Sequence, residues 1–357
     1  MRKASRAFLG KLLSAPGPSG YEDPVRKVWI AEVEKHADSA SVDVHGNAIA
    51  VVNAEGQPRV MLAGHMDELG FQVVHIDDEG FISFDTVGGF DIGIVPGRKV
   101  RVHTDDGEVL GVIGKKPIHL MSAADRNKAP AKHELWIDIG AKDGKEARKL
   151  VAVGDPVTYD ANFEILRRDL AVSKAFDNRM GAYVVAETLR RVAAEAAKGK
   201  GVKAALYSVA TVQEEVGLRG ARTSTYGVDP DVGIALDVTF ATDYPGMDKR
   251  RYGDIKLGGG PVLNRGANVN PVVYNRLVSV AKKKKIPYQI CAEPGGTGTD
   301  ANAMQLSRAG VATGLVSVAL RNMHTVVEVL SLDDLDRTVA LLTEFTINLD
   351  KNAEFIP

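Results

Sequence analysis

The chain has a single cysteine, Cys291, among its 357 residues, so no disulfide can form within it. Unpaired thiols are typical of reducing compartments, and a cytoplasmic location is therefore expected. A lone cysteine near a glycine-rich loop can act as a nucleophile. No Cys-His signature surrounds Cys291, which favours a small buried apolar side chain instead.

Charge of one sign and long apolar runs are also missing. The formal net charge is −1, so no overall field attracts nucleic acid or an acidic membrane surface. No run approaches the roughly 20 apolar residues of a membrane helix. The N-terminal stretch resembles a signal peptide weakly, but Lys11 interrupts it, and the spacing of Phe8, Leu12 and Leu13 fits a short amphipathic helix. We expect neither nucleic-acid nor membrane partners.

The one basic cluster is the lysine run at residues 282–285. It follows a helical pattern at residues 272–280 and precedes Ile286-Pro287. Lysines at a helix C-terminus are stabilised by the helix dipole and stay solvated. This position favours a solvated helix end over a site for a polyanion.

The length and composition predict a globular protein of two domains, or one domain that carries an insertion. Hydrophobic residues make up 45% and charged residues 25% of the chain, which is ordinary for a soluble protein. Residues 1–70 and 163–357 alternate between helical and strand-like patterns, which predicts an α/β domain with a central, mostly parallel sheet flanked by helices. Residues 71–162 carry short strand-like runs separated by Gly, Asp or Pro, which predicts a small β-barrel or sandwich. Because candidate site residues lie on both sides of this segment, we expect it to be inserted into the α/β domain.

The expected elements follow from the spacing of apolar residues and from turn residues. Helices are predicted at residues 23–35, 179–197, 218–226, 271–284, 300–308 and 332–349. Strands of the α/β domain are predicted at residues 59–63, 204–212, 232–236, 288–292 and 314–318, and those of the insertion at 71–76, 81–84, 99–104, 108–113, 135–139 and 156–159. Residues 121–132 are polar and aperiodic, which predicts a mobile loop.

Acids and histidines stand at the ends of several of these apolar runs. His65 and Asp67 follow one predicted strand, Glu214 and Glu215 follow a second, and Asp237 follows a third. Side chains just past buried parallel strands meet at the edge of the sheet where α/β folds place their sites. Together with Asp177 and His324, they form a mixed nitrogen and oxygen ligand set that suits a two-metal hydrolytic centre, with one acid left over for proton transfer.

Each residue of this set also has a plainer interpretation. Asp177 stands between a strand and a helix, where it can be the shared carboxylate of two ions or an ordinary N-cap. Glu214 and Glu215 repel each other if both are ionised, which a pair of cations relieves, but a solvated strand end is an even alternative. A lone histidine is more often structural than a ligand. Asp67 lies two residues from His65 in an extended segment, so it faces the same way and can orient the imidazole. The coincidence of all these residues favours the metal site.

Two glycine-rich stretches, Gly258-Gly259-Gly260-Pro261 and Gly295-Gly296-Thr297-Gly298-Thr299-Asp300, match neither the Walker nor the dinucleotide fingerprint. They are interpreted as walls of the substrate cleft or as plain loops. The sequence has no His-Glu-x-x-His helix. It also has no Gly-x-Ser-x-Gly elbow, and this absence disfavours serine-hydrolase chemistry.

In their joint order, these segments resemble one family over nearly the whole chain: the tetrahedral (TET-type) metallo-aminopeptidases of peptidase family M42, related to glutamyl and deblocking aminopeptidases. The segments that carry the resemblance are Pro18-Ser19-Gly20-Tyr21-Glu22, Gly64-His65-Met66-Asp67-Glu68, Lys116-Pro117-Ile118-His119, Phe176-Asp177-Asn178-Arg179, Gln213-Glu214-Glu215-Val216-Gly217-Leu218-Arg219-Gly220, Asp237-Val238-Thr239, Gly296-Thr297-Gly298-Thr299-Asp300-Ala301 and Arg321-Asn322-Met323-His324-Thr325.

The resemblance implies a ligand set for each of two ions. His65, Asp177 and Asp237 would hold one divalent ion, and Asp177, Glu215 and His324 the second. Glu214 would be the general base, and Asp67 would orient His65.

It also implies the architecture: an α/β zinc-peptidase-like catalytic domain, an inserted β domain used in subunit association, and a homo-oligomer, in this family a dodecamer. Family members often have proline and an aromatic residue where this chain has Ala319 and Asn322, which puts the substrate preference in doubt rather than the activity.

The leading hypothesis is removal of N-terminal residues from peptides by a metal-dependent aminopeptidase. A water between the two ions would be the nucleophile and Glu214 the base. Zinc is the first expectation, and cobalt and manganese also accept this ligand mix. The alternatives are a metal-dependent hydrolase of another amide or of a polysaccharide, and a non-catalytic assembly protein of the same fold. Glycoside hydrolysis ordinarily uses two free carboxylic groups and no metal, whereas most acids here would be ligands.

Overall fold

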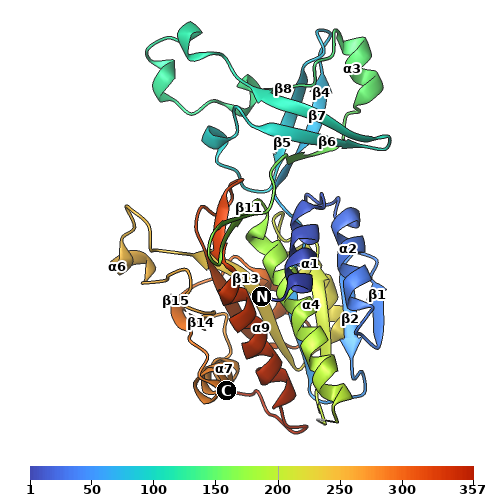
Figure 1. Cartoon of the computed structure of the whole chain (residues 1–357), viewed down its shortest axis with the longest axis vertical. Helices are drawn as coiled ribbons and strands as arrows, with labels where there is room; N and C mark the ends of the chain where they lie inside the picture. Colours follow the sequence, from blue (N-terminus) through green and yellow to red (C-terminus); the bar gives the residue numbers. More distant parts are fainter. Residues whose placement is uncertain (200) are drawn as a thin grey trace.

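The computed structural model describes residues 1–199 and 201–357. A sheet layered with helices forms the larger part, and a small β-barrel lies beyond one end of it (Figure 1). The predicted α/β class with an inserted barrel is confirmed. Within the described residues, no helix combines the length and apolar character needed to cross a bilayer.

The main sheet has a parallel centre and antiparallel flanks. Its strand order in the described chain is β1-β2-β12-β3-β13-β16-β14-β15. The pairs β12/β3, β3/β13, β13/β16 and β14/β15 are parallel, whereas β1/β2, β2/β12 and β16/β14 are antiparallel. The strands are β1 (Ser39–Val42), β2 (Ala48–Val52), β3 (Arg59–His65), β12 (Ala205–Thr211), β13 (Val232–Phe240), β14 (Val262–Gly266), β15 (Gln289–Glu293) and β16 (Ala312–Leu320).

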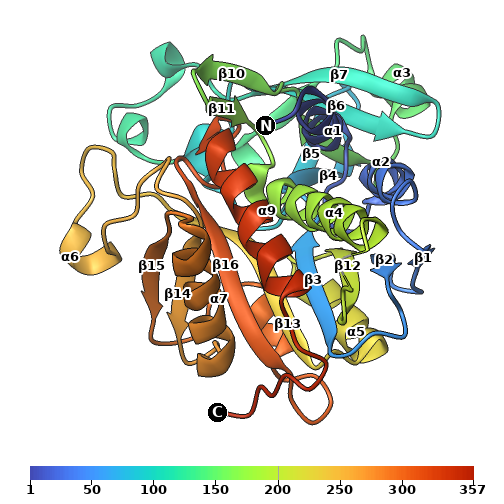
Figure 2. The same cartoon turned by 60° about the horizontal axis from the view of Figure 1, so that its bottom comes forward.

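Helices cover both faces of this sheet. A Cβ at Gly64 of β3 would meet the backbone of Gly181 in α4 (Phe176–Ala197), so α4 lies directly on that face. Gly233 of β13 aligns with Met61, on the opposite face of the sheet from Gly64, and its Cβ would meet Met304 of α8 (Asp300–Met304). Helix α9 (Leu332–Ile347) packs beside α4 (Figure 2). Helix α5 (Arg219–Val228) packs with α8. The remaining helices around the sheet are α1 (Lys3–Ser14), α2 (Asp23–Val33) and α7 (Pro271–Lys284).

The barrel lies in the segment between β3 and α4. Its strands close in the order β4-β5-β8-β7-β6-β9 around a separate core that includes Phe71, Ile82 and Val157. They are β4 (Gly70–Ile76), β5 (Ile82–Val87), β6 (Lys99–Thr104), β7 (Gly107–Gly114), β8 (Trp136–Asp138) and β9 (Pro156–Tyr159), with α3 (Gly144–Leu150) beside them. The use of this domain in subunit association stays a prediction.

A third, three-stranded sheet joins the two parts. It contains β10 (Glu164–Arg167), β11 (Leu170–Ser173) and β17 (Glu328–Ser331), all antiparallel. These strands and β14 escape the sequence analysis because they are four or five residues long and show little alternation. The short helix α6 (Lys249–Tyr252) and single turns at Ile92–Ile94, Ile118–Leu120, Asp125–Asn127 and Lys132–Glu134 complete the chain.

Two predicted boundaries differ where the site begins. Strand β13 does not stop at Leu236 but continues to Phe240, because β16 pairs with it through Leu320. The helix predicted at residues 300–308 ends at Met304, and residue Arg308 already has a φ of 52°.

Candidate metal centre

His65 is the last residue of β3, and Asp67 lies just beyond it. The Asp67 Oδ1 atom lies 3.2 Å from His65 Nδ1, and both side chains are almost fully buried. A carboxylate at Nδ1 keeps the proton on that nitrogen and leaves the Nε2 lone pair free. The Nε2 atom points into the site, 3.3 Å from Asp177 Oδ1 and 3.7 Å from Glu214 Oε2.

Asp67 also fixes the loop that carries the two glutamates. Its carboxylate accepts backbone N–H bonds from Glu214 at 3.1 Å and from Glu215 at 3.2 Å. The Ser19 hydroxyl donates to the same carboxylate at 2.6 Å. The end of β3 is thereby joined to the turn after β12, where Gln213 has a φ of 53°.

Asp177 stands at the start of α4 but does not cap it. Its ψ of 105° is non-helical, and the capping bond comes from the next residue, since Asn178 Oδ1 accepts the backbone N–H of Gly181 at 3.1 Å. The two carboxylate oxygens instead face two histidines: Oδ1 faces His65, and Oδ2 lies 3.3 Å from His324 Nε2. Buried Asn178 donates to Leu236 O at 2.6 Å, which ties the helix start to β13 beside Asp237. The geometry is that of a shared carboxylate rather than an N-cap.

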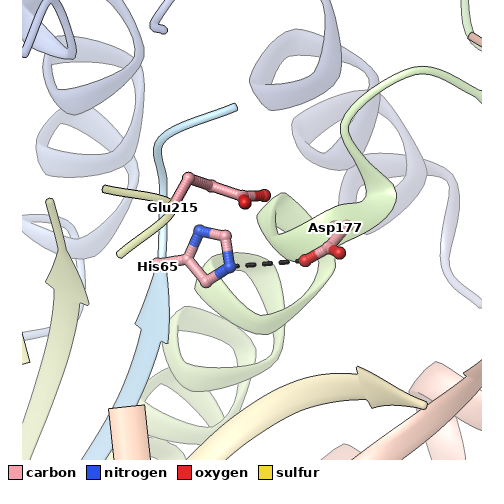
Figure 3. A group of neighbouring side chains, drawn as sticks. All are labelled: His65, Asp177 and Glu215. Atoms are coloured by element: carbon pink, nitrogen blue, oxygen red, sulfur yellow. Dashed lines mark ion pairs between the residues drawn. The ribbon is translucent and has the colours of Figure 1, made fainter. Parts of the chain in front are cut away.

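Two groups of potential ligands meet here, and they have His65 in common. The atoms of His65, Asp177 and Glu215 lie within 4.8 Å of one another (Figure 3), as do those of His65, Glu214 and Asp237. Asp237 is inside β13, at a register position just past the last pairing of β13 with β3, Ala63↔Ala235. It therefore reaches the edge of the sheet without standing after a strand.

His324 completes the cluster from the segment between β16 and β17. Its Nδ1 lies 3.0 Å from the carbonyl oxygen of Gly89, in the barrel segment between β5 and β6. Glu328 accepts the backbone N–H groups of His324 at 2.9 Å and of Asp177 at 3.1 Å, so one buried carboxylate positions two candidate ligands. The His324 side chain is 39% exposed. The side chains of His65, Asp177 and Glu215 are each 8% exposed or less.

The acids of the cluster resist ionisation together. Burial, with the Asp237 and Asp300 carboxylates, raises the pKa of Glu214 to about 10. Burial and the Asp177 carboxylate raise the pKa of Glu215 to about 7, and they raise the pKa of Asp237 well above its usual range. These acids are adapted to a nearby positive charge.

The histidines and Asp177 shift in the complementary direction. Burial opposes a charged His65, but the Glu214 and Asp67 carboxylates raise its pKa well above the usual value. The Asp177 carboxylate raises the pKa of His324 to about 9. Despite its burial, Asp177 has a pKa lowered to about 2, because its carboxylate oxygens pair with the two histidines.

The residues present fit a pair of divalent cations. His65 Nε2 and Glu215 Oε1 are buried, and neither has a hydrogen-bond partner in the part of the chain that the structure describes. An imidazole nitrogen among buried carboxylate oxygens needs a positive charge beside them, which either a proton on the ring or a bound cation supplies. Imidazole nitrogens and carboxylate oxygens are the donors that zinc and related ions accept.

These pKa shifts predict how pH acts on the chelated protein. The pKa values of Glu215 and His324 are raised in the folded chain. At any pH between the ordinary and the raised pKa of such a group, the folded chain therefore binds more protons than the unfolded chain. Stability from such groups is complete below the ordinary pKa and is lost as pH rises through the raised one. The melting temperature in chelator should therefore fall from pH 5 to pH 9, and that of the metal-loaded protein should fall less. Scanning fluorimetry at constant ionic strength measures both, and a chelated protein that gains stability over this range would contradict the electrostatics.

A cavity of about 320 Å³ opens beside the cluster. Its lining includes His65, Asp177, Asp237 and Gly298. The second glycine-rich stretch, residues 295–300, therefore forms part of its wall. The first stretch does not line it. Gly258 and Gly260 instead donate their backbone N–H groups to Asp334 of α9, each at 2.7 Å, which makes this a structural loop.

The structure brings all seven predicted site residues to this one location. It adds residues that the sequence analysis did not single out: Ser19, Gly89, Asn178 and Glu328. Ser19 and Asn178 lie inside the quoted motifs, so their position was a usable signal. Glu328 follows two valines in an unremarkable stretch, and a backbone carbonyl such as that of Gly89 leaves no trace in the sequence.

Comparison with known proteins places the chain in a family. The model of the M42 glutamyl aminopeptidase family matches residues 46–341. The chain is 37% identical over 353 residues to the lysyl aminopeptidase of Pyrococcus furiosus, which covers 98% of this chain and 99% of that protein. The TET aminopeptidase of a marine-sediment archaeon of the Thaumarchaeota superposes with a TM-score of 0.92 at 36% identity, over 97% of each chain. The TET1 peptidase of Pyrococcus horikoshii gives 0.85 at 34% identity, over 97% of this chain and 100% of that one.

The α/β fold with its inserted barrel superposes on both of these peptidases over nearly the whole chain. The chain belongs to peptidase family M42, and it is accordingly a peptidase. The resemblance noted from the sequence motifs is confirmed.

Proposed function

We propose that this protein is an aminopeptidase that depends on two divalent cations and removes N-terminal residues from peptides. The observation that carries the proposal is Asp177, whose two oxygens each lie 3.3 Å from a different histidine. A carboxylate shared in this way is what a two-ion hydrolytic centre requires. The family and its aminopeptidase members support the reaction class.

In this proposal, His65, Asp177 and Asp237 hold one ion, and Asp177, Glu215 and His324 hold the other. Bound there, the cations would polarise the first peptide carbonyl, stabilise the oxyanion and lower the pKa of the attacking water. Glu214 accepts the proton from that water and delivers it to the leaving nitrogen. Asp67 keeps the His65 proton on Nδ1, and Glu328 holds the backbones of Asp177 and His324.

The assignment of Glu214 as base rather than ligand rests on its position. It lies within ligand distance of His65 and Asp237, so proximity alone would allow either role. Asp237 and His65 already supply donors on that side of Asp177, and Glu214 is the acid left over. Its pKa, raised by burial, falls when cations bind nearby, and this prepares the carboxylate to accept a proton.

The size and lining of the cavity support an exopeptidase. It extends from the metal centre past β13 and β16 to β15, the last strand of the sheet in the described chain, and its volume of about 320 Å³ is at the lower end for ligand pockets. An N-terminal residue can occupy such a pocket while the rest of the peptide leaves on the other side. The expected metals are zinc first, then cobalt or manganese.

We also propose that the protein works as a homo-oligomer. The Pyrococcus horikoshii relative is described as assembling into a tetrahedron or a large octahedral shell. The barrel is the candidate for subunit association, and a dodecamer is the expected assembly. A polysaccharide substrate is less compatible with the site, because glycoside hydrolysis needs two free carboxylic groups and most acids here face histidines.

Chelation and metal add-back against amino-acyl anilides test the function. The untreated protein should release the aniline, EDTA should abolish the release, and zinc, cobalt or manganese should restore it. A cellulose derivative is assayed in parallel. Hydrolysis of anilides that survives complete removal of metal would exclude the two-ion mechanism, and activity on the cellulose derivative alone would exclude the aminopeptidase.

A further inference from the structure

The part of the cavity away from the metal centre is lined by acidic, neutral polar and apolar side chains. This distal part is lined by β13, β14, β15 and β16, with Phe240, Asn264, Glu293, Leu315 and Ser317 among its residues. No lysine or arginine occurs among the described residues that line the cavity. The histidines that line it, His65 and His324, both belong to the proposed metal centre.

Glu293 is the acid of this lining that lies outside the metal centre. It is the last residue of β15 and half-buried. In the part of the chain that the structure describes, its carboxylate receives a contact from the Cys291 thiol at 3.6 Å and has no cationic partner. An acid that lines a cavity without a counter-ion can pair with a charge brought by the ligand.

Asn264 reinforces the same preference. In the register of β14 and β15, Asn264 aligns with Cys291, and Gly266 aligns with Glu293, so Asn264 and Glu293 lie on the same face of the sheet. The Asn264 amide nitrogen donates to Ser317 Oγ at 2.8 Å, which leaves Oδ1 as a buried acceptor without a partner in the described residues. Asn264 is among the residues that line the cavity, so a donor group on a ligand there can satisfy this acceptor.

The remaining lining suits a long aliphatic stem. Phe240 and Leu315 contribute apolar surface to the lining. A lysine or arginine side chain has this character, because its methylene stem packs on apolar surface and its charged end donates hydrogen bonds. The acids of the metal centre would be offset by the cations that they bind, whereas the charge of Glu293 would not.

We propose that this cavity receives the side chain of the substrate's N-terminal residue, that it selects lysine and arginine, and that Glu293 is the residue that determines this specificity. The proposal rests on the aminopeptidase function proposed above and deepens it. Glu293 pairs with the ammonium or guanidinium group, and Asn264 Oδ1 accepts a further hydrogen bond. An N-terminal glutamate is repelled.

The experiment compares kcat/KM of the metal-loaded protein for lysyl, arginyl, norleucyl, leucyl and glutamyl p-nitroanilides. Norleucine has the lysine stem without the ammonium, so the lysine-to-norleucine ratio isolates the charge. We expect a ratio of roughly 10 to 100, as is typical of a charge-assisted hydrogen bond. Glutamyl anilide should be the poorest substrate.

Glu293→Gln should reduce the lysine-to-norleucine ratio of kcat/KM about tenfold. Glu293→Lys should reverse the order of lysyl and glutamyl substrates, which keeps the proposal testable if the first variant folds poorly. Glu55→Gln is the matched control. Glu55 is exposed and precedes the start of β3, whereas the metal centre lies at the end of that strand. Circular dichroism and metal content establish that each variant is folded and loaded.

The outcomes separate this inference from the function on which it depends. If the loaded wild-type protein cleaves none of the anilides, the aminopeptidase proposal fails. Equal kcat/KM for lysine and norleucine would overturn the selection of basic side chains. An unchanged ratio in Glu293→Gln would overturn the role of Glu293, and in both cases the aminopeptidase proposal would stand.

Discussion

Glu214→Gln should bind both cations with near-normal affinity and lose roughly 10²–10⁴-fold in kcat, the usual contribution of a general acid–base group. The amide is isosteric with the carboxylate, but it cannot accept the proton of the attacking water. Because Glu214 is held through its backbone N–H by Asp67, the substitution leaves the loop geometry in place. Steady-state kinetics with an amino-acyl anilide, together with elemental analysis of the same sample, measures both quantities.

Glu215→Gln is the matched control for this prediction. It is the adjacent residue, its backbone is held by the same Asp67 carboxylate, and its proposed role is that of a ligand. It should therefore lose metal as well as activity. A Glu214→Gln protein that turns over at a near-normal rate would remove Glu214 from the role of base, and one that loses metal would make it a ligand.

Asp177→Asn should abolish binding of both ions and reduce activity to background. Asp177 faces His65 with one oxygen and His324 with the other, so Asn replaces one of these donor oxygens with an NH2 group and removes the negative charge that both ions share. We expect metal affinity to fall by more than about 100-fold, since changes outside the direct ligands already cost 10- to 100-fold. Inductively coupled plasma mass spectrometry after dialysis gives the stoichiometry.

His324→Ala provides the comparison, because its imidazole belongs to one ligand set only. This variant should retain one of the two ions. If Asp177→Asn keeps its full complement of metal, or if His324→Ala loses both ions, then Asp177 is not shared in the way proposed here.

Most of the candidate site could be predicted because the ends of buried strands can be recognised in a sequence. Apolar runs with acids or imidazoles at their ends predict the convergence of His65, Glu214 and Asp237 at one edge of a parallel sheet, and the structure brings them together there. Asp177 remained ambiguous in the sequence, since capping and metal sharing both require Asp before a helix. The direction of its two oxygens, which only coordinates supply, separates these interpretations.

The missed features depend on contacts between distant residues. The length of β13 is set by its pairing with β16, so a strand predicted from its own residues stops at Leu236, four residues early. Glu328 was overlooked because its partners are backbone groups at positions 177 and 324. Short strands such as β10, exposed at every residue, have no apolar alternation to detect.

The hydrogen bond between His324 and the Gly89 carbonyl has a consequence for attempts to shorten this chain. Excising residues between the two halves of the α/β domain would spare every ionisable group of the active centre. It would nevertheless remove the acceptor that sets the tautomer and the tilt of one imidazole. In the metal centre proposed here, a truncated variant would thus keep all its donor side chains and still coordinate poorly, because the barrel segment positions one of the proposed ligands.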